Sequence, residues 1–204
     1  MRGALIVVLL LAQPVHAQAA CDSEAAELRA HLEGESNHAR KWNVVWAAVF
    51  GAAAVGSFTV AVINPFPDLQ VGLYTSGGKA SIGALGRLIL PLRISIPPPT
   101  GDACTDVAAL RKAIAVAADH ERGNFYLNHV AGILVNGAGA AIIWKYSTDG
   151  QALLSMATGY PVGLLSNYTA PRASWHLYRE RKVTWTTTLT LADDGWMFGV
   201  AGAF

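Results

Sequence analysis

The sequence has few charged residues. Asp, Glu, Lys and Arg make up 14% of its 204 residues, whereas 52% are hydrophobic, and the formal net charge is +1. Soluble domains carry about a quarter charged residues, so this balance indicates membrane association. A nearly neutral chain also offers no basic surface for phosphates, and we expect no nucleic-acid partner.

The sequence motifs of common enzymes are also missing. We find no glycine-rich phosphate loop, no HExxH zinc motif, no GxSxG nucleophile motif and no paired-cysteine metal motif. Glu35 and His38 have the i, i+3 spacing of carboxylate-bridged di-iron bundles, but such sites need the motif twice. The corresponding position of the second half is Ala117. We therefore expect no enzymatic activity, no cofactor and no metal.

Cysteine occurs only twice, at Cys21 and Cys104. Each precedes a helix start signal, Asp22-Ser23-Glu24 in one case and Thr105-Asp106 in the other. If the two helix starts are neighbours, the pair can form a disulfide in an oxidising compartment. The alternatives are two unpaired thiols, or a lipid attached to Cys21.

The first 19 residues have the organisation of a secretory signal peptide. Arg2 is followed by an apolar run over residues 4–12, and Ala17-Gln18-Ala19 forms a small-x-small cleavage site. The alternative is an uncleaved membrane anchor. We expect an exported, membrane-associated protein on the periplasmic side of the cell envelope.

Short identities recur along the chain in the same order. Leu28-Arg29 and His38-x-Arg40 reappear 82 residues later as Leu110-Arg111 and His120-x-Arg122. This self-similarity predicts an internal repeat. The predicted organisation is a helical hairpin over 20–95, a Pro-rich linker over 96–103, a second hairpin over 104–172 and a tail over 173–204. The fold class is mainly all-α, an internally duplicated helical hairpin that forms a four-helix bundle.

Each predicted copy starts with a polar helical segment and continues into an apolar one. Residues 43–63 contain no charge and are numerous enough to cross a bilayer. If four segments cross the membrane after signal cleavage, however, most Lys and Arg remain on the outer side. Membrane proteins usually have their excess of Lys and Arg on the cytoplasmic side. The bundle therefore either spans the membrane or lies against it.

The tail has a different pattern. Residues 183–191 alternate with threonine, which favours a β-strand, and Asp194-Gly195 is a strong signal for a tight turn. The sequence therefore predicts a short β-hairpin at the C-terminal end.

Three polar residues stand inside the second apolar segment: Asn128, His129 and Asn136. Their counterparts in the first copy are Trp46, Ala47 and Ala54, so the polarity is confined to one copy. Polar groups in an apolar helix need partners and often mark a site. They either bond to neighbouring helices or line a ligand pocket.

Two functional hypotheses follow. The first is a structural or accessory cell-envelope protein without catalytic activity, in contact with membrane lipid and with a possible envelope protein partner. The alternative is a helical module of the envelope that binds a lipid or a small apolar ligand between the two copies, at Asn128, His129 and Asn136. Small residues at intervals of four, Ala48, Ala52 and Gly56, allow close helix packing and favour the first hypothesis, whereas the polar residues favour the second.

Overall fold

The computed structural model describes the backbone of residues 3–181, 184–192 and 195–203, and the side chains of residues 18–179. Helices dominate these residues, and the helical bundle predicted from the sequence is confirmed. The elements are α1 (Gly3–Ile63), α2 (Pro67–Ile89), α3 (Ala103–Tyr146), α4 (Asp149–Tyr168), α5 (Ala173–Arg181), β1 (Thr184–Ala192) and β2 (Gly195–Ala203).

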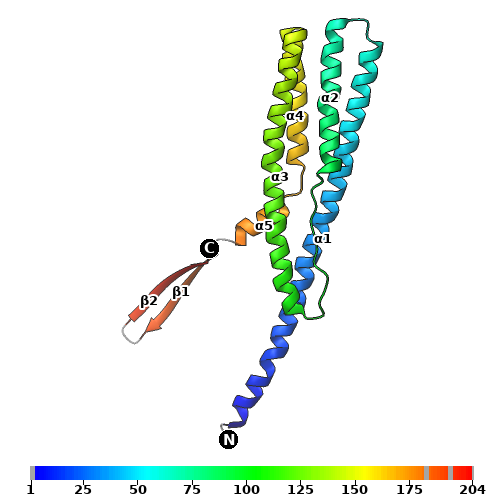
Figure 1. The fold of residues 1–204 in the computed structure, drawn as a ribbon. Helices are drawn as coiled ribbons and strands as arrows, with labels where there is room; N and C mark the ends of the chain where they lie inside the picture. Colours follow the sequence, from blue (N-terminus) through cyan, green and yellow to red (C-terminus); the bar gives the residue numbers. More distant parts are fainter. Residues whose placement is uncertain (1–2, 182–183, 193–194, 204) are drawn as a thin grey trace.

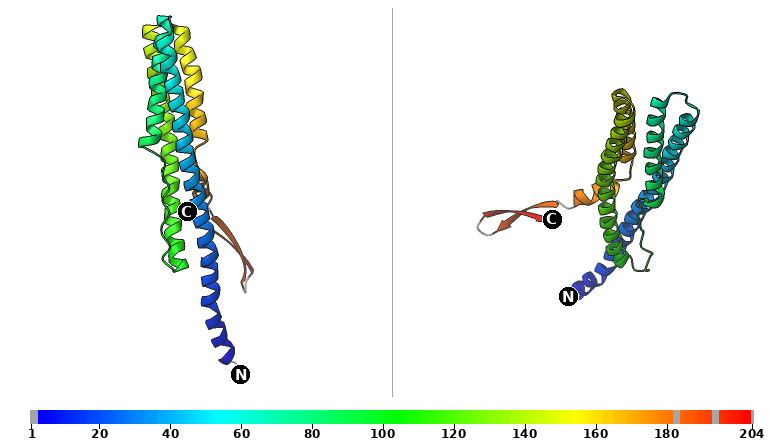
Figure 2. Two further views of the ribbon diagram at one scale, coloured as in Figure 1. Left: turned by 90° about the vertical axis from the view of Figure 1, so that its right-hand side faces the viewer. Right: turned by 45° about the horizontal axis from the view of Figure 1, so that its top comes forward.

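Two helical hairpins lie side by side, α1 with α2 and α3 with α4 (Figure 1). In each hairpin a long helix is followed by a shorter one that returns along it, and the two views of Figure 2 show the same pairing. The long helices run without a break through the change from polar to apolar sequence, because no proline or turn signal interrupts either of them there. The duplication of the sequence itself remains a prediction.

Prolines set the ends of α2. Pro67 occupies its first turn, where a missing N–H costs nothing. Pro91 ends it, since the residue before a proline disfavours the helical conformation. Helix α2 therefore ends at Ile89, before the predicted end of the first hairpin at residue 95. The extended connection runs over residues 90–102, longer than the predicted linker 96–103.

The tail contains a helix that the sequence pattern did not predict. Helix α5 packs against α3 and α1. After it, β1 and β2 pair antiparallel, from Thr184 opposite Ala203 to Ala192 opposite Gly195. The predicted turn includes Asp194, which lies outside the described residues, and a β-hairpin as a stable part of the fold stays a prediction.

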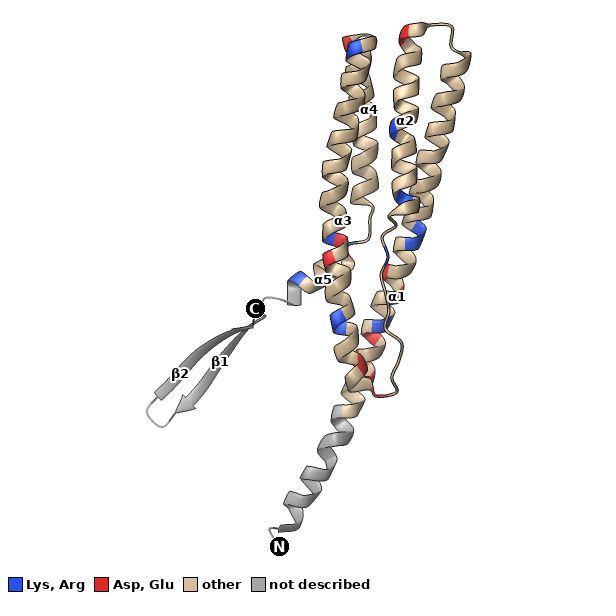
Figure 3. Cartoon of the chain, in the orientation of Figure 1, with Lys and Arg blue, Asp and Glu red and all other residues tan. Residues whose placement is uncertain are grey.

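The molecule has two halves of different surface character (Figure 3). We call residues 43–63, 67–89, 124–146 and 149–168 the apolar half, and residues 18–42, 90–123 and 169–179 the polar half. Three charged residues of the apolar half, Asp68, Lys145 and Asp149, lie in helix turns next to the connections 64–66 and 147–148, and we call this end of the bundle the tip. Only Lys79 and Arg87 lie deeper in it.

The main hydrophobic core lies in the polar half, between α1, α3 and the extended connection. It is formed by Leu28, Leu32, Ala39, Trp42, Leu92, Ile94, Val107, Leu110, Ile114, Ala117 and Ala170. The apolar half instead exposes large side chains, such as Val62 (70% exposed), Leu134 (65%) and Leu153 (70%). Within the described residues, α1 and α3 are long and apolar enough to cross a membrane.

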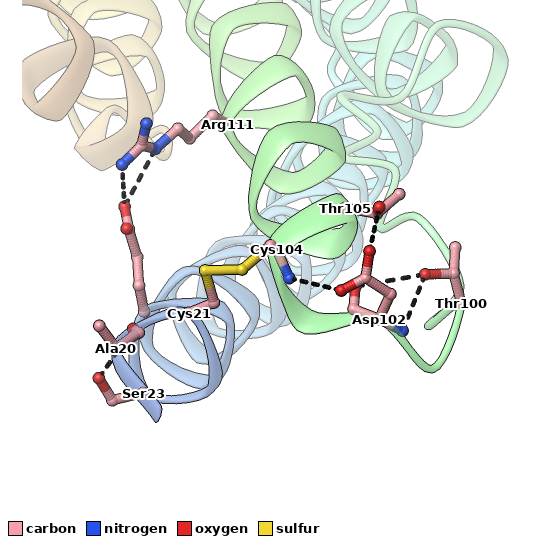
Figure 4. The surroundings of a disulfide bond; sticks show 9 residues. Ala20, Cys21, Ser23, Thr100, Asp102, Cys104, Thr105 and Arg111 are labelled. Carbon is pink, nitrogen blue, oxygen red and sulfur yellow. Dashed lines mark hydrogen bonds and ion pairs between the residues drawn. A yellow bond between two sulfur atoms is a disulfide. The ribbon is translucent and has the colours of Figure 1, made fainter. Parts of the chain in front are cut away.

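In the polar half a disulfide joins the first turn of α3 to Cys21, which lies inside α1, so the helix start predicted at Asp22-Ser23-Glu24 is wrong (Figure 4). The Cα atoms of Cys21 and Cys104 are 5.0 Å apart, and 83 positions separate the residues in the sequence. Nearby, Nη2 of Arg111 lies 2.6 Å from Oε1 of Glu24, which adds a second link between α1 and α3. The disulfide and the two candidate spans are compatible with a membrane or exported protein.

Candidate functional site

Lys79 on α2 reaches between α3 and α4 inside the apolar half. Its Nζ donates to Ser155 Oγ at 2.7 Å, to Ser155 O at 3.2 Å and to Asn136 Oδ1 at 3.3 Å. Two glycines make room for it. A Cβ atom at Gly139 would lie 2.6 Å from Lys79 Cδ, and one at Gly159 would collide with Asn136 Oδ1. The small residues thus admit a charged side chain rather than another helix backbone.

Arg87, closer to the end of α2, makes a second set of polar contacts. Its Nη1 donates to Asn128 Oδ1 at 3.3 Å and its Nη2 to Ser166 Oγ at 3.0 Å. The guanidinium also lies 4.1 Å from the centre of the Trp42 ring, a favourable cation–π distance. Trp42 itself is buried and donates to Ser166 O.

These contacts form two levels across antiparallel helices. Lys79 precedes Arg87 by eight residues on α2, and Asn128 precedes Asn136 by eight residues on α3. Eight helical residues span about 12 Å, so the two levels match in height. Among residues 18–179, no carboxylate forms an ion pair with Lys79 or Arg87. The interior therefore holds two cations that are stabilised by amide, hydroxyl and aromatic groups.

The three residues singled out in the sequence do not come together. Asn128 and Asn136 face α2, and both accept hydrogen bonds from its cations. His129 faces away from them and packs edge-on against the Phe125 ring, with centroids 4.5 Å apart. A ligand site at these residues stays a prediction. Lys79 and Arg87 were not predicted as the partners of these asparagines, although the shared eight-residue spacing of the two pairs could have revealed them.

Asn136→Ala is expected to lower the stability of the detergent-solubilised protein. The change removes one acceptor from the half-buried Lys79 ammonium, and a buried polar group left without a partner costs about 1 to 3 kcal/mol. Thermal unfolding measures the loss, and mass spectrometry of the same samples measures co-purified lipid. If Asn136 instead lines a ligand pocket, the variant should lose the lipid and keep its melting temperature.

Asn37→Ala is the matched control, because Asn37 is exposed on α1. It should leave the melting temperature unchanged. Asn136→Asp should recover stability, since a carboxylate supplies both an acceptor and the missing negative charge for Lys79. Equal melting temperatures for wild type and Asn136→Ala would refute the structural role of this contact.

A second polar cluster holds the start of α5 against the two long helices. Oε2 of Glu121 on α3 accepts from Trp175 N at 2.8 Å, and Oε2 of Glu35 on α1 accepts from Ala173 N at 3.1 Å. The first backbone N–H groups of a helix have no partner within the helix and favour negative charge. The two carboxylates therefore cap α5 and tie it to both hairpins.

Glu121 is 1% exposed, and its Oε1 has no hydrogen-bond partner. This burial raises the pKa of Glu121 to about 7. The bond from Trp175 N–H opposes the shift, whereas repulsion from the Glu35 carboxylate adds to it. His31 borders the cluster through Ser174 Oγ, 3.2 Å from its Nε2. Glu121 can thus gain a proton near neutral pH.

Glu121 was not predicted, because the residue 82 positions after Glu35, which the repeat makes its counterpart, is Ala117. In the structure, the carboxylate that interacts with Glu35 comes one helical turn later. Glu35 also lies 4.0 Å from His38 Nδ1, as their i, i+3 spacing allows. Among the described residues, no group of three or more His, Cys, Asp or Glu side chains is placed to hold a metal ion.

No known protein family, curated protein or solved structure matches this chain. Its function therefore has to be argued from its own contacts. The chain has an exposed apolar surface, two half-buried cations between its helices, a capped helix α5 and a disulfide.

Proposed function

We propose that this chain is a structural or accessory protein of the cell envelope, without catalytic activity, whose apolar half lies in the bilayer. The observation that carries the proposal is the exposed surface of all four helices of that half. Large hydrophobic side chains cover it, including Val55 on α1, Leu85 on α2, Leu134 on α3 and Leu153 on α4. A contiguous apolar surface of this extent needs lipid or protein to cover it.

The dimensions of the apolar half fit a bilayer. Helices α2 and α4 have 23 and 20 residues. At 1.5 Å per residue, about 20 residues cross the 30 Å hydrocarbon core. The two deeper cations of this half, Lys79 and Arg87, point inward to polar partners rather than toward lipid, as membrane proteins require.

The disulfide supports a hairpin that crosses the membrane and returns. Cys21 and Cys104 have to lie on the same side to be joined, and α1 and α2 separate them in the chain. An export signal in residues 1–19 would place this side in the periplasm, where disulfides persist. This orientation leaves most Lys and Arg on the periplasmic side and only Lys145 at the tip, the reverse of the usual cytoplasmic excess, so it depends on the export signal and the disulfide.

Labelling of introduced cysteines tests this topology. Gly34 in the polar half and Gly150 at the tip are both exposed, and a side chain at either position meets open space. In intact spheroplasts, a membrane-impermeant maleimide should label Gly34→Cys and not Gly150→Cys. Permeabilisation should expose both. The native cysteines do not compete, because they are joined.

Carbonate extraction of the membranes provides the second measurement. We expect the wild-type chain to remain in the membrane pellet at alkaline pH. Release into the supernatant, or labelling of Gly150→Cys in intact spheroplasts, would reject a bilayer-spanning apolar half.

A lipid-binding role remains a second candidate, because an apolar groove of about 400 Å³ lies between α3 and α4. Ala140, Trp144, Leu153 and Met156 are among its lining residues. Such a groove can hold part of an acyl chain. Native mass spectrometry in mild detergent would show a retained lipid, and Ala140→Trp should fill the groove and displace it.

A further inference from the structure

A second groove lies where the polar half meets the apolar half. It has a volume of about 450 Å³ and is bounded by α1, α2 and the extended residues 91–94. Its lining includes the charged residues Arg40, Arg87 and Arg93, the hydroxyl of Ser36, and the apolar side chains of Val44 and Leu88.

The groove is positively charged and has no acidic counterpart. None of its lining residues is Asp or Glu. Arg40 and Arg93 are exposed, and within residues 18–179 neither forms an ion pair. Arg87 adds positive potential from behind the groove, because Asn128 and Ser166 hold its guanidinium. Two free guanidinium groups supported by a third favour a phosphate group as ligand.

The surroundings of the arginines favour a phosphate attached to acyl chains. Val44 lies one helical turn beyond Arg40, toward the apolar half, and is 63% exposed. Leu88, in the last turn of α2, is 66% exposed. The exposed aliphatic side chains of Val44 and Leu88 thus lie next to the arginines, on the side of the apolar half. A phospholipid has the same order, with its phosphate at the interface and its chains below it.

We propose that this groove binds the headgroup of an anionic phospholipid, with Arg40 and Arg93 on the phosphate and Val44 and Leu88 against the acyl chains. The inference rests on the proposed function, because it requires the apolar half to lie in a bilayer. It names the lipid class that the protein selects and the residues that select it.

The test uses purified full-length protein in mild detergent, titrated with phosphatidylglycerol or with phosphatidylcholine and followed by native mass spectrometry. Wild-type protein should prefer phosphatidylglycerol. Each basic residue near an anionic lipid contributes roughly fivefold in affinity, so Arg40→Gln/Arg93→Gln should bind phosphatidylglycerol roughly 25-fold more weakly. Binding of phosphatidylcholine should change little.

Arg122→Gln is the matched control. It corresponds to Arg40 in the second long helix, is exposed and does not line the groove. Equal weakening by Arg122→Gln, or unchanged affinity in the double variant, would overturn the site while the chain remains in the membrane. If inorganic phosphate alone binds as well as phosphatidylglycerol, the groove is a site for a soluble anion. Release of the wild-type chain from membranes by carbonate would instead reject the proposed function itself.

Discussion

Replacing both Cys21 and Cys104 by serine is expected to destabilise the polar half by about 2 to 5 kcal/mol. The bond closes a loop between residues 83 positions apart, and long loops gain the most conformational freedom when a crosslink is lost. It also joins the parts of α1 and α3 that project beyond the apolar half, where α2 and α4 do not accompany them (Figure 1).

Hydrogen exchange on the detergent-solubilised protein locates this loss. Protection should fall in residues 21–42 and 104–123, and stay nearly constant in α2 and α4. Dithiothreitol should produce the same change in wild type and none in the double serine variant. Uniform loss of protection over the whole bundle would contradict a local role of the disulfide.

Glu121→Gln is expected to remove a pH dependence of stability. The pKa of Glu121 is about 7 in the folded chain, against 4.5 when it is exposed. Between these values the folded state holds the additional proton, so wild-type stability falls as pH rises from 4.5 to 7. This difference in pKa corresponds to a loss of about 3 kcal/mol in the free energy of unfolding. The glutamine keeps an acceptor for Trp175 N–H and carries no charge, so the variant should be more stable at pH 8.

Unfolding of both proteins at pH 4.5, 6, 7 and 8 measures the effect, since the other titratable groups, including Glu35, His31 and His38, are shared. The curves should meet near pH 4.5 and diverge by pH 8. Asp119→Asn removes an exposed carboxylate from the same helix and should not change the slope. Parallel curves for wild type and Glu121→Gln would show that Glu121 does not titrate in this window.

The helices were predictable because apolar runs and proline turns are local signals. Of the two cysteines, Cys104 lies next to a helix start as predicted, whereas Cys21 lies inside α1. The capping of α5 was not predictable in this way. It depends on Glu35 and Glu121, which are far apart in sequence and meet only because α1 and α3 pack together.

Trp42 illustrates the same limit. Its place at the start of an apolar segment suits a residue of the membrane interface, as does that of Trp144. In the structure Trp144 is 67% exposed near the tip, but Trp42 is 4% exposed under Arg87. Composition predicts where an apolar segment starts. Which side of the helix a tryptophan occupies depends on a partner from another helix.

The two cations between the helices, Lys79 and Arg87, have a consequence for the order in which the chain is assembled in a membrane. A lysine at the centre of an isolated inserting helix costs about 3 kcal/mol. Asn136 and Ser155, which bind Lys79, are synthesised 57 and 76 residues later. Helix α1 can enter the bilayer early, whereas α2 gains its polar partners only when α3 and α4 arrive. The first hairpin is therefore expected to be completed by the second, so truncation after residue 102 should leave α2 poorly inserted.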